Sequence, residues 1–389
     1  MWSNKKEINI VINVLLFLLA INLFHYGQFI LPIICLILFI DNKFKINVGN
    51  IKIFILLCFF GLTFFIFSYK LGFYSVMGLC LPMAYYIGSN IKDPTEKNIK
   101  TIIYIISFAM ASHVVLNFIY ELSIDGISYI NSYTHYDIWL QSKIKETLTA
   151  VNYMFIIGCA YYLAVYEKEK RDKIVGLSLL VVLFIYNIGL GRRTPVLMIV
   201  LAVIISLILD VFIVNKNKKA KAIGVLLAIV FIPILLVVII YLFNLFGLKE
   251  WLSHLKVVDK FLWMGLKSER LELFVNAVKL MPNHIWGGQE ISNSVGIYIH
   301  DLWMDTYDYA GIVPYVLLII YSIIYLINMI KIYMNKEINN EYKLLFIVLF
   351  IVITIQMFLD PIMSGSSIFL ICTVLIGACF ERLNKKYGK

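Results

Sequence analysis

Charged residues are scarce in this sequence. Asp, Glu, Lys and Arg make up 15% of the 389 residues, whereas hydrophobic residues make up 61%. Soluble domains carry about 25% charge and are about half apolar, so the composition excludes an ordinary soluble protein and indicates a membrane protein. Apolar runs recur along the chain and leave no hydrophilic segment long enough for a separate soluble domain. We therefore expect one polytopic domain over residues 1–389.

The sequence also lacks the patterns of several common binding sites. Its six cysteines fall inside predicted spans, with neither paired nor metal-ligand spacing, so we expect neither disulfides nor a zinc site. It has no glycine-rich nucleotide-binding loop and no internal repeat. We therefore expect no cofactor and no ATP-driven step, and any energy must come with the substrate or from a gradient.

Hydropathy and helix breakers predict an all-α integral membrane protein with about twelve transmembrane helices. The second and last spans are short for a bilayer core of about 30 Å, so they are either re-entrant or continue into their flanks. The predicted spans cover residues 8–24, 27–41, 51–69, 71–89, 101–121, 149–166, 174–190, 194–214, 223–247, 311–331, 344–361 and 365–380.

Lysine and arginine are concentrated in alternate loops. With the N-terminus inside, most of them lie in cytoplasmic loops, as the positive-inside rule requires, and the C-terminus is cytoplasmic too. The net charge of +10 is then explained by contact with anionic membrane lipids, and it does not indicate a nucleic-acid partner.

Two predicted external loops are long, at residues 122–148 and 248–310, and we expect function to lie there. In the larger loop, two stretches carry apolar residues at helical spacing opposite polar faces. Both are predicted to lie along the membrane surface. The first contains Trp251, Leu255, Val258 and Leu262, and the second contains Leu271, Phe274, Val275 and Val278.

Arginine is rare, with five residues against 29 lysines, yet Arg192, Arg193 and Arg270 all lie on the predicted external side. The topology rule disfavours basic residues there. A guanidinium group offers a fixed fork of donors that binds phosphate oxygens in pairs, which makes these arginines candidate pyrophosphate ligands. The alternative is that they pair with nearby carboxylates or reach lipid headgroups.

His300 opens a helical-looking run that leads into the tenth predicted span at Gly311. An imidazole accepts a proton near neutral pH, so His300 is a candidate base; the alternative is a surface histidine in an interfacial helix. Asp301, Asp305 and Asp308 follow at a spacing that places three carboxylates on one helical face. We expect Asp305 and Asp308 to be solvated. A neighbouring arginine, a metal ion or the hydroxyl groups of a glycan are the alternatives that would offset the repulsion between these carboxylates.

Aromatic residues in the same run, Trp303, Tyr307 and Tyr309, are predicted to form an interfacial belt rather than a stacking platform. Asp360 ends the eleventh predicted span on the external side. A carboxylate at that depth is costly unless it is paired or wet, so Asp360 is a further candidate functional residue.

Three stretches resemble motifs of the bacterial O-antigen polymerase and O-antigen ligase superfamily. The first is Gly189-Leu190-Gly191-Arg192-Arg193-Thr194-Pro195, similar to the family's small-residue, arginine and hydroxyl turn. The second runs from Arg270 through a helix and a proline to Gly288. The third is His300-Asp301 followed by Gly311 and Pro314. Two departures from the family pattern are Asp301 in place of an amide or hydroxyl residue, and the adjacent pair Gly287-Gly288 in place of spaced glycines.

The resemblance implies a metal-independent glycosyl transfer on the outer face of the bacterial cytoplasmic membrane. The donor would be an undecaprenyl-pyrophosphate-linked glycan, and a chain-length regulator protein would be a further partner. Arg193 and Arg270, with Arg192 beside them, would hold the pyrophosphate. His300 would orient or deprotonate the acceptor hydroxyl while Asp301 fixes its ring. Asp305 and Asp360 are candidate acceptor-binding residues.

Three functions fit these patterns. The first is polymerisation of lipid-linked repeat units into O-antigen, capsule or exopolysaccharide. The second is a ligase that transfers a finished glycan, which the sequence barely separates from the first. The third is a flippase for lipid-linked repeats. It is less favoured because charges avoid the centres of the spans and because the largest loop has no counterpart in the other half of the chain, whereas transporters are often built from two inverted halves.

Overall fold

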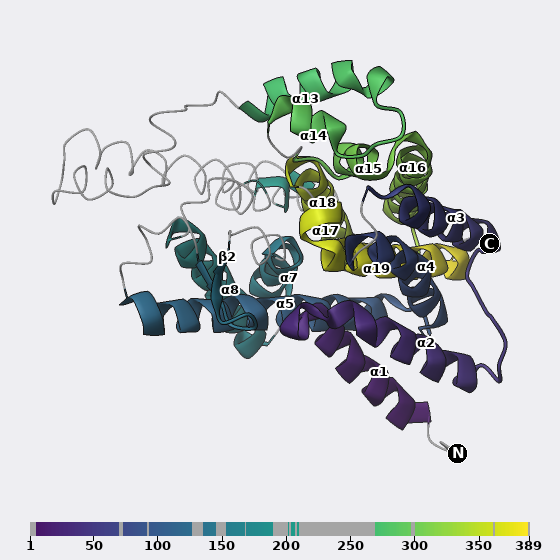
Figure 1. Cartoon of the computed structure of the whole chain (residues 1–389). Helices are drawn as coiled ribbons and strands as arrows, with labels where there is room; N and C mark the ends of the chain where they lie inside the picture. Colours follow the sequence, from purple (N-terminus) through teal and green to yellow (C-terminus); the bar gives the residue numbers. More distant parts are fainter. Residues whose placement is uncertain are drawn as a thin grey trace.

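The computed structural model describes residues 5–69, 73–91, 93–126, 135–144, 153–167, 169–189, 201, 204–206, 208–209, 269–296, 300–360 and 362–387. These residues form a bundle of helices with one short hairpin, and α13, α14 and α15 gather at one end of it (Figure 1). The predicted spans 194–214 and 223–247 and the amphipathic stretch 251–262 lie largely or wholly outside the described residues.

The described part of the first half of the chain supplies seven longer helices and the hairpin. The helices are α1 (Lys5–Ala20), α2 (Ile30–Asp41), α3 (Ile51–Phe67), α4 (Phe73–Asn90), α5 (Glu96–Asp125) and α7 (Tyr153–Tyr166), followed by α8 (Lys170–Gly189). Two 3-10 turns, η1 (Leu23–His25) and η2 (Gly27–Phe29), join α1 to α2. Strands β1 (His135–Asp137) and β2 (Ser142–Ile144) pair antiparallel, with Tyr136 opposite Lys143.

The second half begins with helices of the predicted external loop and ends with three long ones. In order these are α13 (Glu269–Leu280), the turn η7 (Met281–Asn283), α14 (Glu290–Val295), α15 (Leu302–Ala310), α16 (Ile312–Met334), α17 (Asn340–Leu359), the short α18 (Ile362–Gly365) and α19 (Ser367–Tyr387). The apolar stretch predicted at 271–278 is helical as expected, within α13.

Helix starts are set by side-chain caps. Thr95 accepts a hydrogen bond from the backbone N–H of Asn98 at the start of α5, and Asn339 accepts from the N–H of Glu341 at the start of α17. Asn50 does the same for α3. Such caps satisfy N–H groups that have no partner within the helix, so the polar residue before each apolar run fixes where the helix begins.

Each predicted span that falls on described residues coincides with a helix. Four of the described helices are long and apolar enough to cross a membrane: Glu96–Asp125, Ile312–Met334, Asn340–Leu359 and Ser367–Tyr387. The last predicted span, 365–380, continues into its flank as far as Tyr387, whereas the second remains a short helix, Ile30–Asp41, after the turns. The total of twelve spans stays a prediction.

Helix α19 forms the centre of the bundle. In its most apolar window 89% of the residues are buried inside the protein, against 33% for α16. Helices α4, α16 and α18 pack on α19, and α3 packs on α4 and α16. The outward residues of α3 and α16 are large and apolar, including Phe59, Leu62, Ile320 and Ile327, as expected for helices that face lipid.

The helix ends form two groups that match the predicted sidedness. At the predicted inner end, the Asn42 side chain donates to Asn90 at 2.7 Å, and the Tyr387 hydroxyl donates to Glu96 at 2.9 Å. At the predicted outer end, the backbone N–H of Tyr69 donates to the carbonyl of Tyr309 at 3.3 Å. Successive spans cross a membrane in opposite directions, so the helix ends fall alternately into the two groups. Which group faces the cytoplasm stays a prediction.

Candidate functional site

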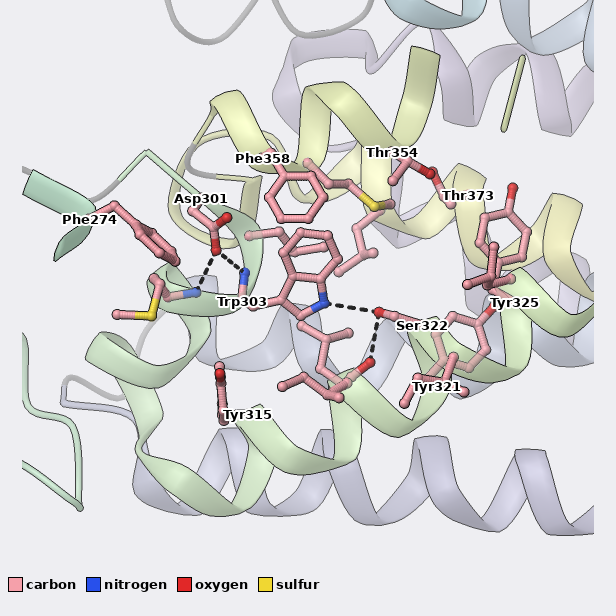
Figure 2. Close-up of a pocket in the computed structure, with 18 of the residues that line it drawn as sticks. Phe274, Asp301, Trp303, Tyr315, Tyr321, Ser322, Tyr325, Thr354, Phe358 and Thr373 are labelled. Carbon is pink, nitrogen blue, oxygen red and sulfur yellow. Dashed lines mark hydrogen bonds between the residues drawn. The ribbon is translucent and has the colours of Figure 1, made fainter. Parts of the chain in front are cut away.

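A cavity of about 530 Å³ lies between α13, α15, α16, α17 and α19 (Figure 2). Its lining runs along α16 from Tyr315 to Leu326, which at 1.5 Å per residue spans about 16 Å. That length is about half of a bilayer core of about 30 Å. The predicted outer end is lined by Asp301 and by Phe274 and Val278 of α13. The walls further in are aromatic, aliphatic and hydroxyl-bearing side chains: Trp303, Leu318, Ile319, Tyr321, Ser322, Tyr325, Phe350, Thr354, Phe358 and Thr373.

Asp301 is the N-cap of α15. One carboxylate oxygen accepts hydrogen bonds from the backbone N–H groups of Trp303 at 3.0 Å and Met304 at 2.9 Å. The residue is only 4% exposed, and burial raises the pKa of this carboxyl to about 6, although the two backbone hydrogen bonds lower it in part. The cavity therefore combines an apolar channel with a buried carboxyl group at its predicted outer end, which suits an amphiphilic ligand.

Trp303 forms one wall of the cavity. Its indole N–H donates to the Ser322 hydroxyl at 3.0 Å, and its ring lies 4.5 Å from that of Phe358 (Figure 2). The neighbouring Tyr307 and Tyr309 are buried: the Tyr307 hydroxyl donates to a backbone carbonyl in η7 at 2.6 Å. The expected interfacial belt was therefore wrong for Tyr307 and Tyr309, because α15 packs inside the protein and not along its surface.

The expectation that Asp305 and Asp308 are solvated was also wrong, because both are buried. Asp308 caps the neighbouring helix α14: its carboxylate accepts from the backbone N–H of Ile291 at 3.0 Å, and from both the backbone N–H and the hydroxyl of Ser292. Because an ionised carboxylate is favoured at a helix N-terminus, Asp308 serves to join α14 to α15.

Two glycines bring distant motifs together. Gly287 and Gly311 both have positive φ, at 77° and 84°. A Cβ atom on Gly311 would lie 2.6 Å from the carbonyl oxygen of Ile285, and one on Gly287 would lie 2.6 Å from the backbone nitrogen of Gly311. Only glycine fits such backbone contacts, so the Arg270–Gly288 and His300–Gly311 motifs, separate in sequence, pack against each other.

The predicted site residues fall into three groups. His300 precedes Asp301 and is partly exposed, and Arg270 lies in the first turn of α13, four residues before Phe274, which lines the cavity. Asp360 is the C-cap of α17 and accepts a hydrogen bond from the Gln356 amide. Arg192 and Arg193 lie outside the described residues.

The sequence analysis missed a second polar cluster, at the predicted outer ends of α1 and α5. The carboxylate of Asp137 lies 3.0 Å from Nε2 of His25 in η1 and 3.4 Å from Nε2 of His113 in α5. The Asn117 amide also donates to it at 3.3 Å. A histidine inside a predicted span was the available signal, because buried ionisable groups in membranes are costly.

Within the described residues, no group of three or more His, Cys, Asp or Glu side chains is arranged to hold a metal ion. The carboxylates described above take hydrogen bonds from helix N–H groups, amides or imidazoles.

Comparison with known proteins gives one clear result. A family model described as O-antigen polysaccharide polymerase Wzy matches residues 1–262. No curated protein matches the chain. The matched residues include Asp137, His25, His113 and the arginine pair, whereas the cavity and His300 lie beyond them.

Proposed function

The chain belongs to the O-antigen polysaccharide polymerase Wzy family, and from this membership we propose that it joins repeat units carried on undecaprenyl pyrophosphate into a surface polysaccharide. The reaction takes place on the outer face of the bacterial cytoplasmic membrane. The product is O-antigen, capsule or exopolysaccharide. The matching family is one of polymerases, which favours polymerisation over the ligase and flippase alternatives.

The observation that carries this proposal is the shape of the cavity. It is apolar along about 16 Å of α16, close to the depth of one leaflet of about 15 Å. It has a carboxylate, the first turn of α15, and Phe274 and Val278 of α13 at its outer end. Ile323, Leu326 and Phe358 line the cavity and are also exposed on the outside of the bundle, so a polyprenyl chain reaches it sideways from the membrane.

The residues around the outer end suit the head of such a lipid. Arg270 lies in the first turn of α13, the helix whose Phe274 and Val278 line the cavity. We assign Arg270, with Arg193 and Arg192, to the pyrophosphate, whose charge grows as the sugar departs. His300 orients or deprotonates the acceptor hydroxyl with Asp301 beside it, and Asp305 and Asp360 support acceptor binding. The reaction needs no nucleotide because the phospho-sugar bond supplies the driving force.

The first test is deletion of the gene, followed by size separation of surface and lipid-linked glycans. A strain with the gene restored is the reference. Loss of long chains with accumulation of single repeats on the lipid supports the proposal. Long chains that persist on the lipid carrier would show that the protein is a ligase or unrelated to chain growth.

The second test fills the cavity. Ile319 lines it, whereas the next residue, Ile320, is 40% exposed on the outside of α16 and does not line it. Ile319→Trp is expected to shorten or abolish the polymer because the indole occupies the space of the lipid chain. Ile320→Trp, the matched control, is expected to leave polymer length unchanged. Wild-type polymer from both variants would remove the lipid-binding role of the cavity.

A further inference from the structure

The cavity beneath Asp301 is closed at its inner end. The rings of Tyr325 on α16 and Phe350 on α17 lie 5.0 Å apart there, beside Thr373 of α19. Figure 2 places Tyr325 and Thr373 at the end of the cavity that is far from Asp301. Behind them lies the fully buried ring of Phe380, 6.4 Å from that of Tyr325. A chain that enters beside Asp301 therefore cannot continue inward past these rings.

The hydroxyl groups in the walls of the cavity already have hydrogen-bond partners. Ser322, Thr354 and Thr373 each donate to the backbone carbonyl four residues earlier in their own helix, at 2.8 Å. Ser322 also accepts the hydrogen bond from the indole of Trp303. Hydroxyl groups that bond to their own helix offer little to a polar ligand. Below Asp301 the cavity is therefore suited to hydrocarbon and not to a sugar.

The volume of the cavity limits how much hydrocarbon it holds. An apolar protein cavity of about 150 Å³ binds one benzene molecule, which corresponds to about 25 Å³ for each carbon. At that ratio, the cavity of about 530 Å³ holds about 20 carbons. An isoprene unit has five carbons, so the cavity has room for about four units.

The length of the cavity gives a second, independent limit. An extended polypeptide advances at most about 3.6 Å over three backbone bonds, or about 1.2 Å per bond. An isoprene unit adds four bonds to the main chain of the lipid, so it spans about 5 Å when extended. The lining along α16 is about 16 Å long and therefore accommodates about three units. Volume and length agree on three to four units.

The rest of a longer lipid can leave the cavity sideways. Ile323 and Leu326 of α16 and Phe358 of α17 line the cavity, and they are 51%, 45% and 55% exposed on the outside of the bundle. A chain that turns out between them enters the bilayer, whose lipid tails are as apolar as the cavity. Isoprene units beyond this opening have the same surroundings whether or not the protein is bound, so they add no affinity.

We propose that the cavity recognises only roughly the first four isoprene units after the pyrophosphate, so most of an undecaprenyl chain, which has eleven, lies in the membrane outside α16 and α17. This inference rests on the proposed function, in which the cavity holds the lipid of the donor. The substrate class is then any repeat unit carried on a polyprenyl pyrophosphate of about four units or more. The protein does not select the full length of the natural carrier.

Binding of polyprenyl pyrophosphates without a sugar tests this limit. The purified full-length protein in lipid nanodiscs is given compounds of two, four, six and eleven isoprene units, each counted as its mole fraction in the bilayer. Thermal stabilisation reports the Kd. We expect the Kd to fall on the order of tenfold from two units to four, and to change by less than about twofold from four to eleven.

Three results would overturn the proposal: a Kd that keeps falling beyond six units, a Kd that is the same at two and at eleven, and absence of binding at every length. The readout is binding and does not depend on polymerisation. Failure of the gene deletion to affect polymer would instead refute the proposed function.

A matched pair of variants tests the sideways exit. Leu326 lines the cavity at the opening, whereas its neighbour Ile327 is 44% exposed and is not part of the lining. Leu326→Trp narrows the opening, so the Kd of the eleven-unit compound should rise on the order of tenfold while that of the four-unit compound stays within about threefold. Ile327→Trp should change neither value. If Leu326→Trp does not fold, Leu326→Phe replaces it. A wild-type ratio of the two Kd values in the folded Leu326 variant would refute the exit between α16 and α17.

Discussion

Replacing Asp301 by Asn should stabilise the protein and at the same time reduce its activity. Asn is as good an N-cap as Asp, so the side-chain oxygen keeps its bonds to the two backbone N–H groups of α15. What the variant loses is the buried charge. Burial raises the pKa of Asp301 from 3.8 to about 6, which corresponds to roughly 3 kcal/mol at neutral pH.

The sign follows from proton binding. Because the pKa of Asp301 is higher in the folded protein than in the unfolded chain, the folded state holds more protons between pH 4 and 6. Its free energy of unfolding therefore falls as pH rises through this window and stays low above it. The free energy of unfolding of Asp301→Asn should not show that decline. It should equal that of the wild type below about pH 4 and exceed it by up to about 3 kcal/mol at pH 7.

The assay is thermal unfolding of the purified protein in lipid nanodiscs between pH 4 and 8, with Asp301→Ala as the control. The alanine variant loses the cap as well as the charge, so it should be less stable than Asp301→Asn by about 1 kcal/mol at every pH. In the polymer assay, Asp301→Asn should shorten the product, because a charge that costs stability is retained for function. A lower stability of Asp301→Asn than of wild type at pH 7, or a full-length polymer, would refute this reasoning.

Two other substitutions test the packing around the site. Gly311→Ala should lower the free energy of unfolding by on the order of 3 kcal/mol, because Gly311 has a positive φ and a Cβ there would meet a backbone carbonyl. Gly296→Ala is the control, since Gly296 also has a positive φ but faces open space. It should lower the free energy of unfolding by about 1 kcal/mol in the same thermal unfolding assay. Asp308→Ala leaves two backbone N–H groups of α14 without their acceptor and should cost about 3 kcal/mol, whereas Ser294→Ala, which removes one exposed hydroxyl, should change stability by less than about 0.5 kcal/mol.

Much of the helical fold was predictable from short stretches of the sequence. Long apolar runs and the polar residues before them define the helices, so the spans at 311–331 and 344–361 match α16 and α17 closely. The helix at 271–278 and the helical run from His300 to Gly311 followed from the spacing of their residues, whereas the cap at Asp301 was not predicted. The predictions that failed concern exposure, because a sequence pattern does not show which neighbour covers a helix face.

The sequence by itself determined the class of protein, the positions of the helices and, through the family it belongs to, the chemistry to expect. Composition and the spacing of apolar residues can be read from the chain itself. A stretch of about 20 apolar residues is long enough to cross a bilayer as a helix, so these features predict the spans directly. Only the tertiary structure decided that Asp308 caps α14, that Gly287 meets Gly311, and that α16, α17 and α19 enclose a cavity beneath Asp301. It also brought His25 and Asp137 together across 112 positions. Such contacts depend on how helices pack against one another, and no local pattern records them.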